Sequence, residues 1–193
     1  MTEEELIRGC LKHEPAAQRE LYLQYFSKVM HVCIRYSKSP QGAKAILLNA
    51  FKNILNGFRN HVELNAKRKK DLPPITLEEW INKETIASAV QHMHADKKEH
   101  FVSSTVSMRD SGKKSDQELS DEQIINSSDK LMIIKALQQL TPSYRVIYNL
   151  HEVDGYSHPE ISLLLDISEY TSQDSLSKAK FNLRKNICGI IPQ

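Results

Sequence analysis

The chain has little of what marks an exported, disulfide-stapled or membrane-spanning protein. Its three cysteines, Cys10, Cys33 and Cys188, are odd in number and widely spaced, which is typical of reduced thiols rather than of a disulfide framework. No apolar run approaches the ~18–20 residues that a membrane-spanning helix needs. The first five residues are acidic where a secretory signal would be basic. We therefore expect a cytoplasmic protein without membrane insertion.

Motifs for catalysis and for cofactor binding are also missing. The sequence contains no glycine-rich phosphate loop, and Cys33 has no evident base partner that would activate its thiol. His92, His94 and His100 lie close together, but helical positions two apart point about 200° away from each other and converge poorly on one ion. We therefore expect neither an enzyme, nor a metal site, nor a cofactor.

Apolar periodicity predicts helices throughout residues 1–98. Pro15 suits a first helical turn, and Pro40 disfavours helix in the residue before it. One inward face is predicted to consist of Tyr22, Phe26, Val29, Cys33 and Tyr36. The next is predicted to consist of Ile46, Leu47, Ala50, Phe51, Ile54, Leu55 and Phe58.

The second of these helices is expected to weaken at Asn56–Gly57 and to lead into a polar loop over residues 65–74. That loop includes the basic run Lys67–Lys70, which fits either a solvated loop or a nucleic-acid contact. Thr76 and Glu79 then fit a capping box, which opens a third helix. We expect Trp80, near the start of that helix, to pack in the core.

Residues 99–128 are rich in Ser, Asp, Lys, Gln and Glu and hold too little apolar surface to offset the entropy of ordering. We predict a flexible linker here, with one short helical piece near residues 119–125. No strand pattern or internal repeat is evident. The predicted fold is all-α: one helical domain over residues 1–98, the linker, and a second helical domain over residues 129–193.

The second domain shows the pattern of a helix-turn-helix. Leu131, Ile134, Leu137 and Leu140 line a first helix, Thr141–Pro142 begins the next, and Asp154–Gly155 ends it. A capping box at Ser157 and Glu160 then opens a short helix with Ile161, Leu164 and Leu165 inward. After a turn at Asp166–Ile167, Ser168 caps a longer helix, and its inward residues are Leu176, Ala179, Leu183 and Ile187.

The longer helix of such a motif enters the major groove of DNA. Residues 175–193 hold four basic residues and no acid, which suits a phosphate backbone. Asp174 lies on the outward face, where it would repel phosphate but could accept from a cytosine amine. A plain helical hairpin that only packs a core is the alternative. The candidate DNA contacts are Tyr170, Thr171, Gln173, Ser175, Lys178, Lys180, Arg184 and Lys185.

Residues 140–168 resemble the fourth conserved region of extracytoplasmic-function sigma factors, the promoter-specificity subunits of bacterial RNA polymerase. The resemblance rests on a Leu-x-x-x-x-Arg-x-Ile lead, a Glu-x-x-Gly-Tyr-Ser-x-x-Glu-Ile core and a closing Ile-Ser. Residues 10–38 are similar to the start of region two, as is Trp80–Ile81. The residues that carry the region-four match are Leu140, Arg145, Ile147, Glu152, Gly155, Tyr156, Ser157, Glu160, Ile161, Ile167 and Ser168.

The resemblance implies a sigma subunit that directs core RNA polymerase to a two-part promoter. Region two would grip the polymerase clamp helices and melt the downstream (−10) element. Region four would read the upstream (−35) element as double-stranded DNA and touch the polymerase flap. The implied partners are core polymerase, promoter DNA and, in many such systems, an anti-sigma factor. By position, the implied polymerase-binding residues are Ala45, Leu48, Asn49 and Lys52.

The sequence departs from this family at three functional surfaces. Ala45, Leu48 and Asn49 stand where the clamp-binding helix usually has Asp, Gln and Glu, and the loss of these charges should weaken paired contacts with a basic partner. Ala87, Gln91 and His94 replace Asn, Asp and Arg in the third helix, and Tyr170, Gln173 and Asp174 replace small and basic residues in the recognition helix. These departures favour an alternative: a sigma-like interaction protein, either a co-regulator or an anti-sigma decoy, that does not initiate transcription.

Overall fold

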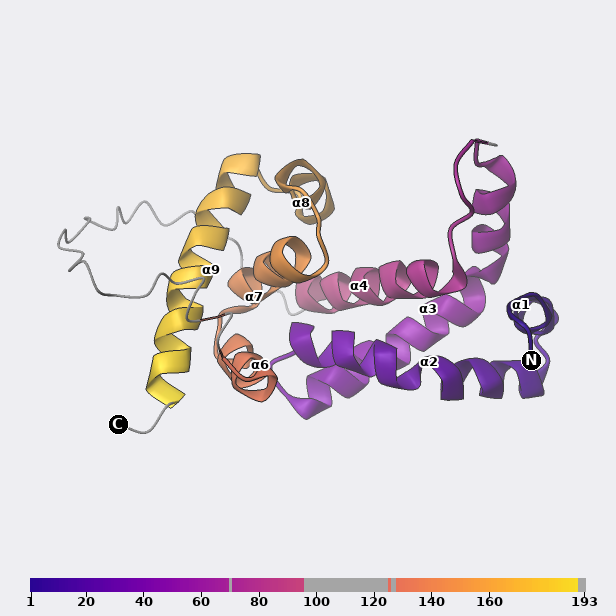
Figure 1. The fold of residues 1–193 in the computed structure, drawn as a ribbon, viewed down its shortest axis with the longest axis horizontal. Helices are drawn as coiled ribbons and strands as arrows, with labels where there is room; N and C mark the ends of the chain where they lie inside the picture. Colours follow the sequence, from indigo (N-terminus) through magenta and orange to yellow (C-terminus); the bar gives the residue numbers. More distant parts are fainter. Residues whose placement is uncertain (70, 96–124, 126–127, 191–193) are drawn as a thin grey trace. The chain divides into compact units, whose positions relative to one another are not determined.

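The computed structural model describes residues 1–69, 71–95, 125 and 128–190, and every regular element within these ranges is a helix (Figure 1). The all-α prediction is therefore confirmed. The chain divides into two compact units, Met1–Ala95 and Asp96–Gln193. The predicted linker lies outside the described residues except for 125 and 128. None of the described helices combines the length and the apolar character that crossing a membrane requires.

Unit 1, Met1–Ala95, contains helices α1 (Glu3–Leu11), α2 (Pro15–Tyr36), α3 (Pro40–Lys67) and α4 (Leu77–Ala95). Their starts follow from local side-chain chemistry. Pro15 and Pro40 occupy the first positions of their helices, where a missing N–H costs nothing. The predicted capping box is confirmed, because Thr76 N donates to Glu79 Oε2 at 3.0 Å and Glu79 N donates to Thr76 Oγ1 at 3.2 Å.

Helix α3 runs through Asn56–Gly57 to Lys67, so the predicted weakening there is wrong. Gly57 serves the packing of Trp80 instead, since a Cβ at this position would lie 2.9 Å from Trp80 Cζ2. Trp80 is 3% exposed, and its ring centroid lies 5.2 Å from that of Phe58, which confirms its predicted core role. Tyr22 is a second correction: it is 43% exposed, although its ring packs against Phe51 at 4.8 Å between centroids.

Unit 2 contains α6 (Lys130–Gln138), α7 (Pro142–Tyr148), the π-helical turn η1 (Asn149–Val153), α8 (His158–Leu165) and α9 (Glu169–Ile190). Helix α9 packs against α6, α7 and α8. Its predicted inward residues are confirmed. They are buried to 7% exposure or less: Leu176, Ala179, Leu183 and Ile187. Leu131 and Leu164 were predicted to face inward but are 66% and 37% exposed.

Arg145 ties α6 to α7. Its side chain is only 2% exposed and donates from Nε to Leu137 O at 2.9 Å, with Nη2 donating to Gln138 O and Leu140 O. Leu137 and Gln138 are the last residues of α6 and Leu140 follows them, so the guanidinium group lies at the helix end where the helix dipole favours a cation. The Leu-x-x-x-x-Arg-x-Ile lead is therefore a structural device, with Leu140 and Ile147 buried on either side.

Candidate nucleic-acid interface

The turn between α8 and α9 has the geometry that its residues predict. Glu160 Oε2 accepts from the backbone N–H of Ser157 at 2.8 Å at the start of α8. Asp166 takes the left-handed conformation with φ 55° and ψ 49°, which Asp tolerates better than most non-glycine residues. Ser168 Oγ accepts from Thr171 N at 3.0 Å and caps α9. Local hydrogen bonds therefore fix where α9 begins.

A contact between α8 and α9 holds the two helices of the motif together. His158 Nδ1 lies 2.9 Å from the hydroxyl of Ser172, which is fully buried. On its other side, the His158 ring stacks on His151 with centroids 4.5 Å apart, and His151 Nδ1 lies 2.9 Å from Glu152 Oε1. The sequence did not predict this cluster, because its members meet only when η1, α8 and α9 pack together.

Three of the eight predicted reading residues on α9 are exposed to the solvent. Tyr170 is 76% exposed, and Gln173 and Lys185 are also exposed. Thr171 and Arg184 are half-buried, and Thr171 Oγ1 is engaged with Ser168 Oγ at 2.8 Å. These residues lie on the predicted recognition helix, and their contact with DNA stays a prediction.

Two predicted contacts do not fit the structure. Ser175 is only 6% exposed, because its position on α9 turns it toward the buried side with Leu176 and Ala179. Lys180 Nζ lies 3.1 Å from Glu152 Oε1, so this side chain ties α9 to η1. We therefore remove Ser175 from the reading face and assign Lys180 to the scaffold behind it.

Asp174 and Lys178 form an ion pair on the outward face of α9. Lys178 Nζ donates to Asp174 Oδ2 at 2.7 Å, with the Asp174 side chain 40% and the Lys178 side chain 19% exposed. Lys178 follows Asp174 by four residues, which is about one helical turn. This spacing brings the two side chains together on one face of the helix. The spacing of Asp174 and Lys178 in the sequence was compatible with an ion pair, but none was predicted from the sequence.

The implied polymerase-binding residues lie together on α3. Leu48 is 72% exposed, Asn49 and Lys52 are exposed, and Ala45 is half-buried. Lys44 lies on the same face and is exposed, so this face of α3 is basic rather than merely uncharged. An acidic partner would be attracted to such a face, and a basic one would be repelled.

The remaining predicted features of unit 1 give no further site. Lys67 is the last residue of α3 and pairs loosely with Glu63 at 3.7 Å, and Lys70 lies outside the described residues. Ala87 is half-buried and Gln91 is exposed on α4. Among the described residues no three side chains could share a metal ion, and neither the His94 side chain nor His100 is described.

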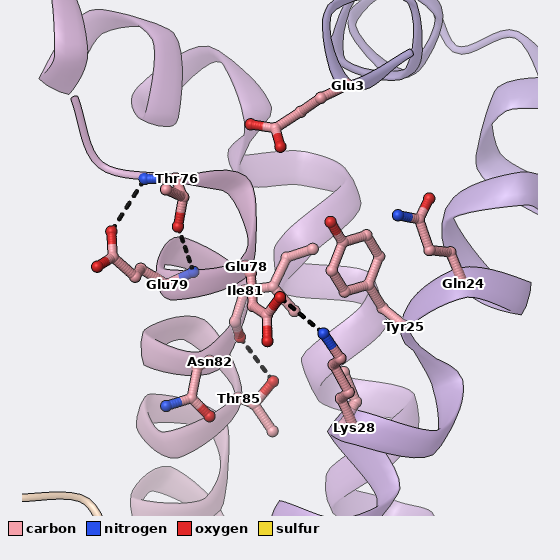
Figure 2. A pocket seen from close by; sticks show the side chains of 11 residues that line it. Glu3, Gln24, Tyr25, Lys28, Thr76, Glu78, Glu79, Ile81, Asn82 and Thr85 are labelled. Carbon is pink, nitrogen blue, oxygen red and sulfur yellow. Dashed lines mark hydrogen bonds and ion pairs between the residues drawn. The ribbon is translucent and has the colours of Figure 1, made fainter. Parts of the chain in front are cut away.

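A hollow of about 590 Å³ opens between α1, α2 and the start of α4 (Figure 2). Its three carboxylates already have partners: Glu3 accepts from Leu77 N, Glu78 pairs with Lys28 at 2.6 Å, and Glu79 belongs to the capping box. These contacts join three helices. They indicate a structural junction of unit 1 rather than a binding site.

The comparison with protein families adds one match. Residues 130–181 match the family described as Sigma-70, region 4. The match spans α6 to most of α9 and thus includes the whole helix-turn-helix, but it covers less than half of the chain. It supports a relation to the sigma-70 family and a DNA-binding role in transcription. No curated protein matches the chain.

Proposed function

We propose that this chain is a sigma factor of the extracytoplasmic-function type, which binds core RNA polymerase and directs it to a promoter with −10 and −35 elements. The observation that carries the proposal is the region-four match over a helix-turn-helix whose caps, turn and core are all in place. Unit 2 would read the upstream element with the first turns of α9. Lys185 and Arg184, near the end of α9, would lie close to phosphates.

The role of unit 1 rests on the resemblance of residues 10–38 and of Trp80–Ile81 to region two. Its four helices enclose a core that includes Trp80, and they leave one face of α3 open to a partner. On that face Leu48 is a large apolar side chain in contact with water. We propose that this face binds the polymerase clamp, with an apolar contact in place of the usual charged ones.

Binding of the purified full chain to core RNA polymerase tests the proposal. Leu48→Arg should weaken binding about tenfold, which equals about 1.4 kcal/mol. Leu64→Arg provides a matched control, because Leu64 is also on α3 and is 52% exposed but lies outside the proposed face. Absence of binding at low salt, or equal loss for both variants, would contradict the proposal.

The basic character of the α3 face supports a second candidate function. Lys44 and Lys52 flank Leu48 there, and no carboxylate replaces the family's acidic residues. A sigma-like protein that has lost polymerase binding would use this face for an acidic partner, as an anti-sigma decoy or a co-regulator. It would bind duplex DNA or an anti-sigma factor without supporting initiation.

A further inference from the structure

We infer that Asp174 and Lys178 act together as the reader of one G·C base pair, with Lys178 over the guanine and Asp174 over the cytosine. The inference rests on the proposed function, because it requires that α9 enter the major groove. It goes further by assigning a base preference to two residues. An acid on a DNA-reading face otherwise has no evident purpose there, since it repels phosphate.

The geometry of the ion pair supplies a donor beside an acceptor. Lys178 Nζ and Asp174 Oδ2 lie 2.7 Å apart. The ammonium group has two further N–H donors, and the carboxylate has a second oxygen that accepts. Tyr170, one turn before Asp174, is 76% exposed, the Asp174 side chain is 40% exposed and the Lys178 side chain is 19% exposed, so the carboxylate side of the pair is the more open to a ligand.

A G·C pair presents the complementary pattern in the major groove. Guanine O6 is an acceptor, cytosine N4 is a donor, and the two atoms are bonded to each other at about 2.9 Å. The ion pair can therefore dock on them edge to edge: Lys178 donates to O6 while N4 donates to Asp174. Both hydrogen-bonded pairs have nearly the same spacing, so four polar groups close one ring.

The direction of the ion pair discriminates among base pairs. A·T and C·G place the donor and the acceptor in the opposite order along the groove, so they would set ammonium against amine. T·A has the right order but puts the thymine methyl beside Lys178. Guanine instead offers N7 as a second acceptor for the same ammonium group.

Charge neutrality lets the pair approach DNA. An isolated Asp174 would be repelled by the phosphates, whereas the pair carries no net charge. The hydrogen bond that Lys178 donates to the Asp174 carboxylate raises the pKa of Lys178, and the charge of Asp174 adds to this effect, so the ammonium form needed to donate is favoured. The phosphate contacts are left to other residues, such as Lys185 at the far end of α9.

Selection of duplexes from a random library by the full chain, followed by binding to variants of the selected site, tests the inference. The wild-type chain should prefer G·C over each of the other three pairs at one position by about tenfold. Inosine·cytosine keeps O6, N7 and N4 and should bind as well as G·C. 7-Deazaguanine lacks N7 and should weaken binding at that position alone.

Protein variants complete the test. Asp174→Ala should reduce the preference at that position, since Lys178 can still donate to guanine, and leave the rest of the motif unchanged. The exchange Asp174→Lys with Lys178→Asp keeps composition and charge but reverses the direction of the pair, so the preference should switch to C·G. A motif with no position that responds to these changes would overturn the inference while leaving the proposed function intact. Enrichment of no duplex at all would overturn both.

Discussion

The guanidinium group of Arg145 donates to the carbonyl oxygen of Leu137 at 2.9 Å, eight residues back along the chain. Through the same side chain it also reaches Gln138 O and Leu140 O. The end of α6 is thus closed by a buried cation from α7. Arg145 belongs to the region-four sequence motif, and its contacts hold together α6 and α7, two of the helices against which α9 packs.

Replacement of Arg145 should destabilise unit 2 selectively. Arg145→Met removes the buried donors to Leu137 O, Gln138 O and Leu140 O, of which Leu137 O keeps a backbone donor in Leu140 N, so we expect the free energy of unfolding of unit 2 to fall by about 3 kcal/mol. Urea unfolding followed by circular dichroism measures this loss. Lys185→Met, at an exposed position of α9, is the matched control and should change stability by less than about 0.5 kcal/mol.

Gly57 and Gly189 should respond in opposite ways to alanine. Alanine favours a helix over glycine by about 1 kcal/mol, but at position 57 its Cβ would meet Trp80 at 2.9 Å. We expect Gly57→Ala to destabilise unit 1 by about 1–3 kcal/mol. Gly189 has no atom within 4 Å of such a Cβ, so Gly189→Ala should be neutral or stabilising. Trp80 is the single tryptophan, and its fluorescence reports the unfolding of unit 1. If Gly57→Ala left the stability of unit 1 equal to that of the wild-type chain, the Trp80 ring would have shifted to admit the added Cβ.

Unit 2 should lose stability as the pH falls through about 6.5, the ordinary pKa of histidine. Burial lowers the pKa of His158, and the neighbouring His151 lowers it further, while Glu152 and Glu169 act in the opposite direction. The unfolded chain therefore takes up a proton that the folded chain resists, and stability rises with pH across this window. His158→Asn cannot titrate and should flatten the dependence of the melting temperature on pH. An unchanged pH profile in that variant would exclude His158 as its source.

Restoration of acidic residues on α3 should strengthen polymerase binding. Ala45→Asp with Asn49→Glu offsets the positive charge of Lys44 and Lys52 on that face, which favours a basic partner surface. The same two changes further along the helix, Ala66→Asp with Asn60→Glu, are a matched control at exposed positions. We expect about tenfold tighter binding for the first pair only. No gain from the first pair would mean that the missing carboxylates do not limit binding.

The parts of the fold that depend on neighbours within four residues were predictable from the sequence. The capping boxes at Thr76 and Ser157 and the left-handed turn at Asp166 are set by local hydrogen bonds and backbone preference. Gly57 was misjudged because its role depends on Trp80, which arrives from another helix. For the same reason Lys180 was assigned to DNA, since its partner Glu152 lies 3.1 Å away in space but far along the chain.

The candidate site was predictable as a helix but not as a set of contacts. Apolar spacing identified the inward face of α9, and Tyr170 and Gln173 are exposed as that face implies. Ser175 sits at the edge of the inward face, where a helical wheel does not decide burial and the packing around α9 does. The base or polymerase group that contacts each exposed residue depends on the structure of the partner, which the sequence of this chain does not encode.

Transcription from a selected promoter tests the central claim most directly. The full chain, core RNA polymerase and a pool of templates that carry the duplex motif selected by this chain upstream of randomised sequence, so that −10 elements are represented, should yield transcripts that start at one fixed distance from the motif. Core polymerase alone should give none, and a template with that motif scrambled should also give none. If the chain binds the motif and core polymerase forms no transcript with it, the chain is not a sigma factor, and the sigma-like interaction protein becomes the correct account.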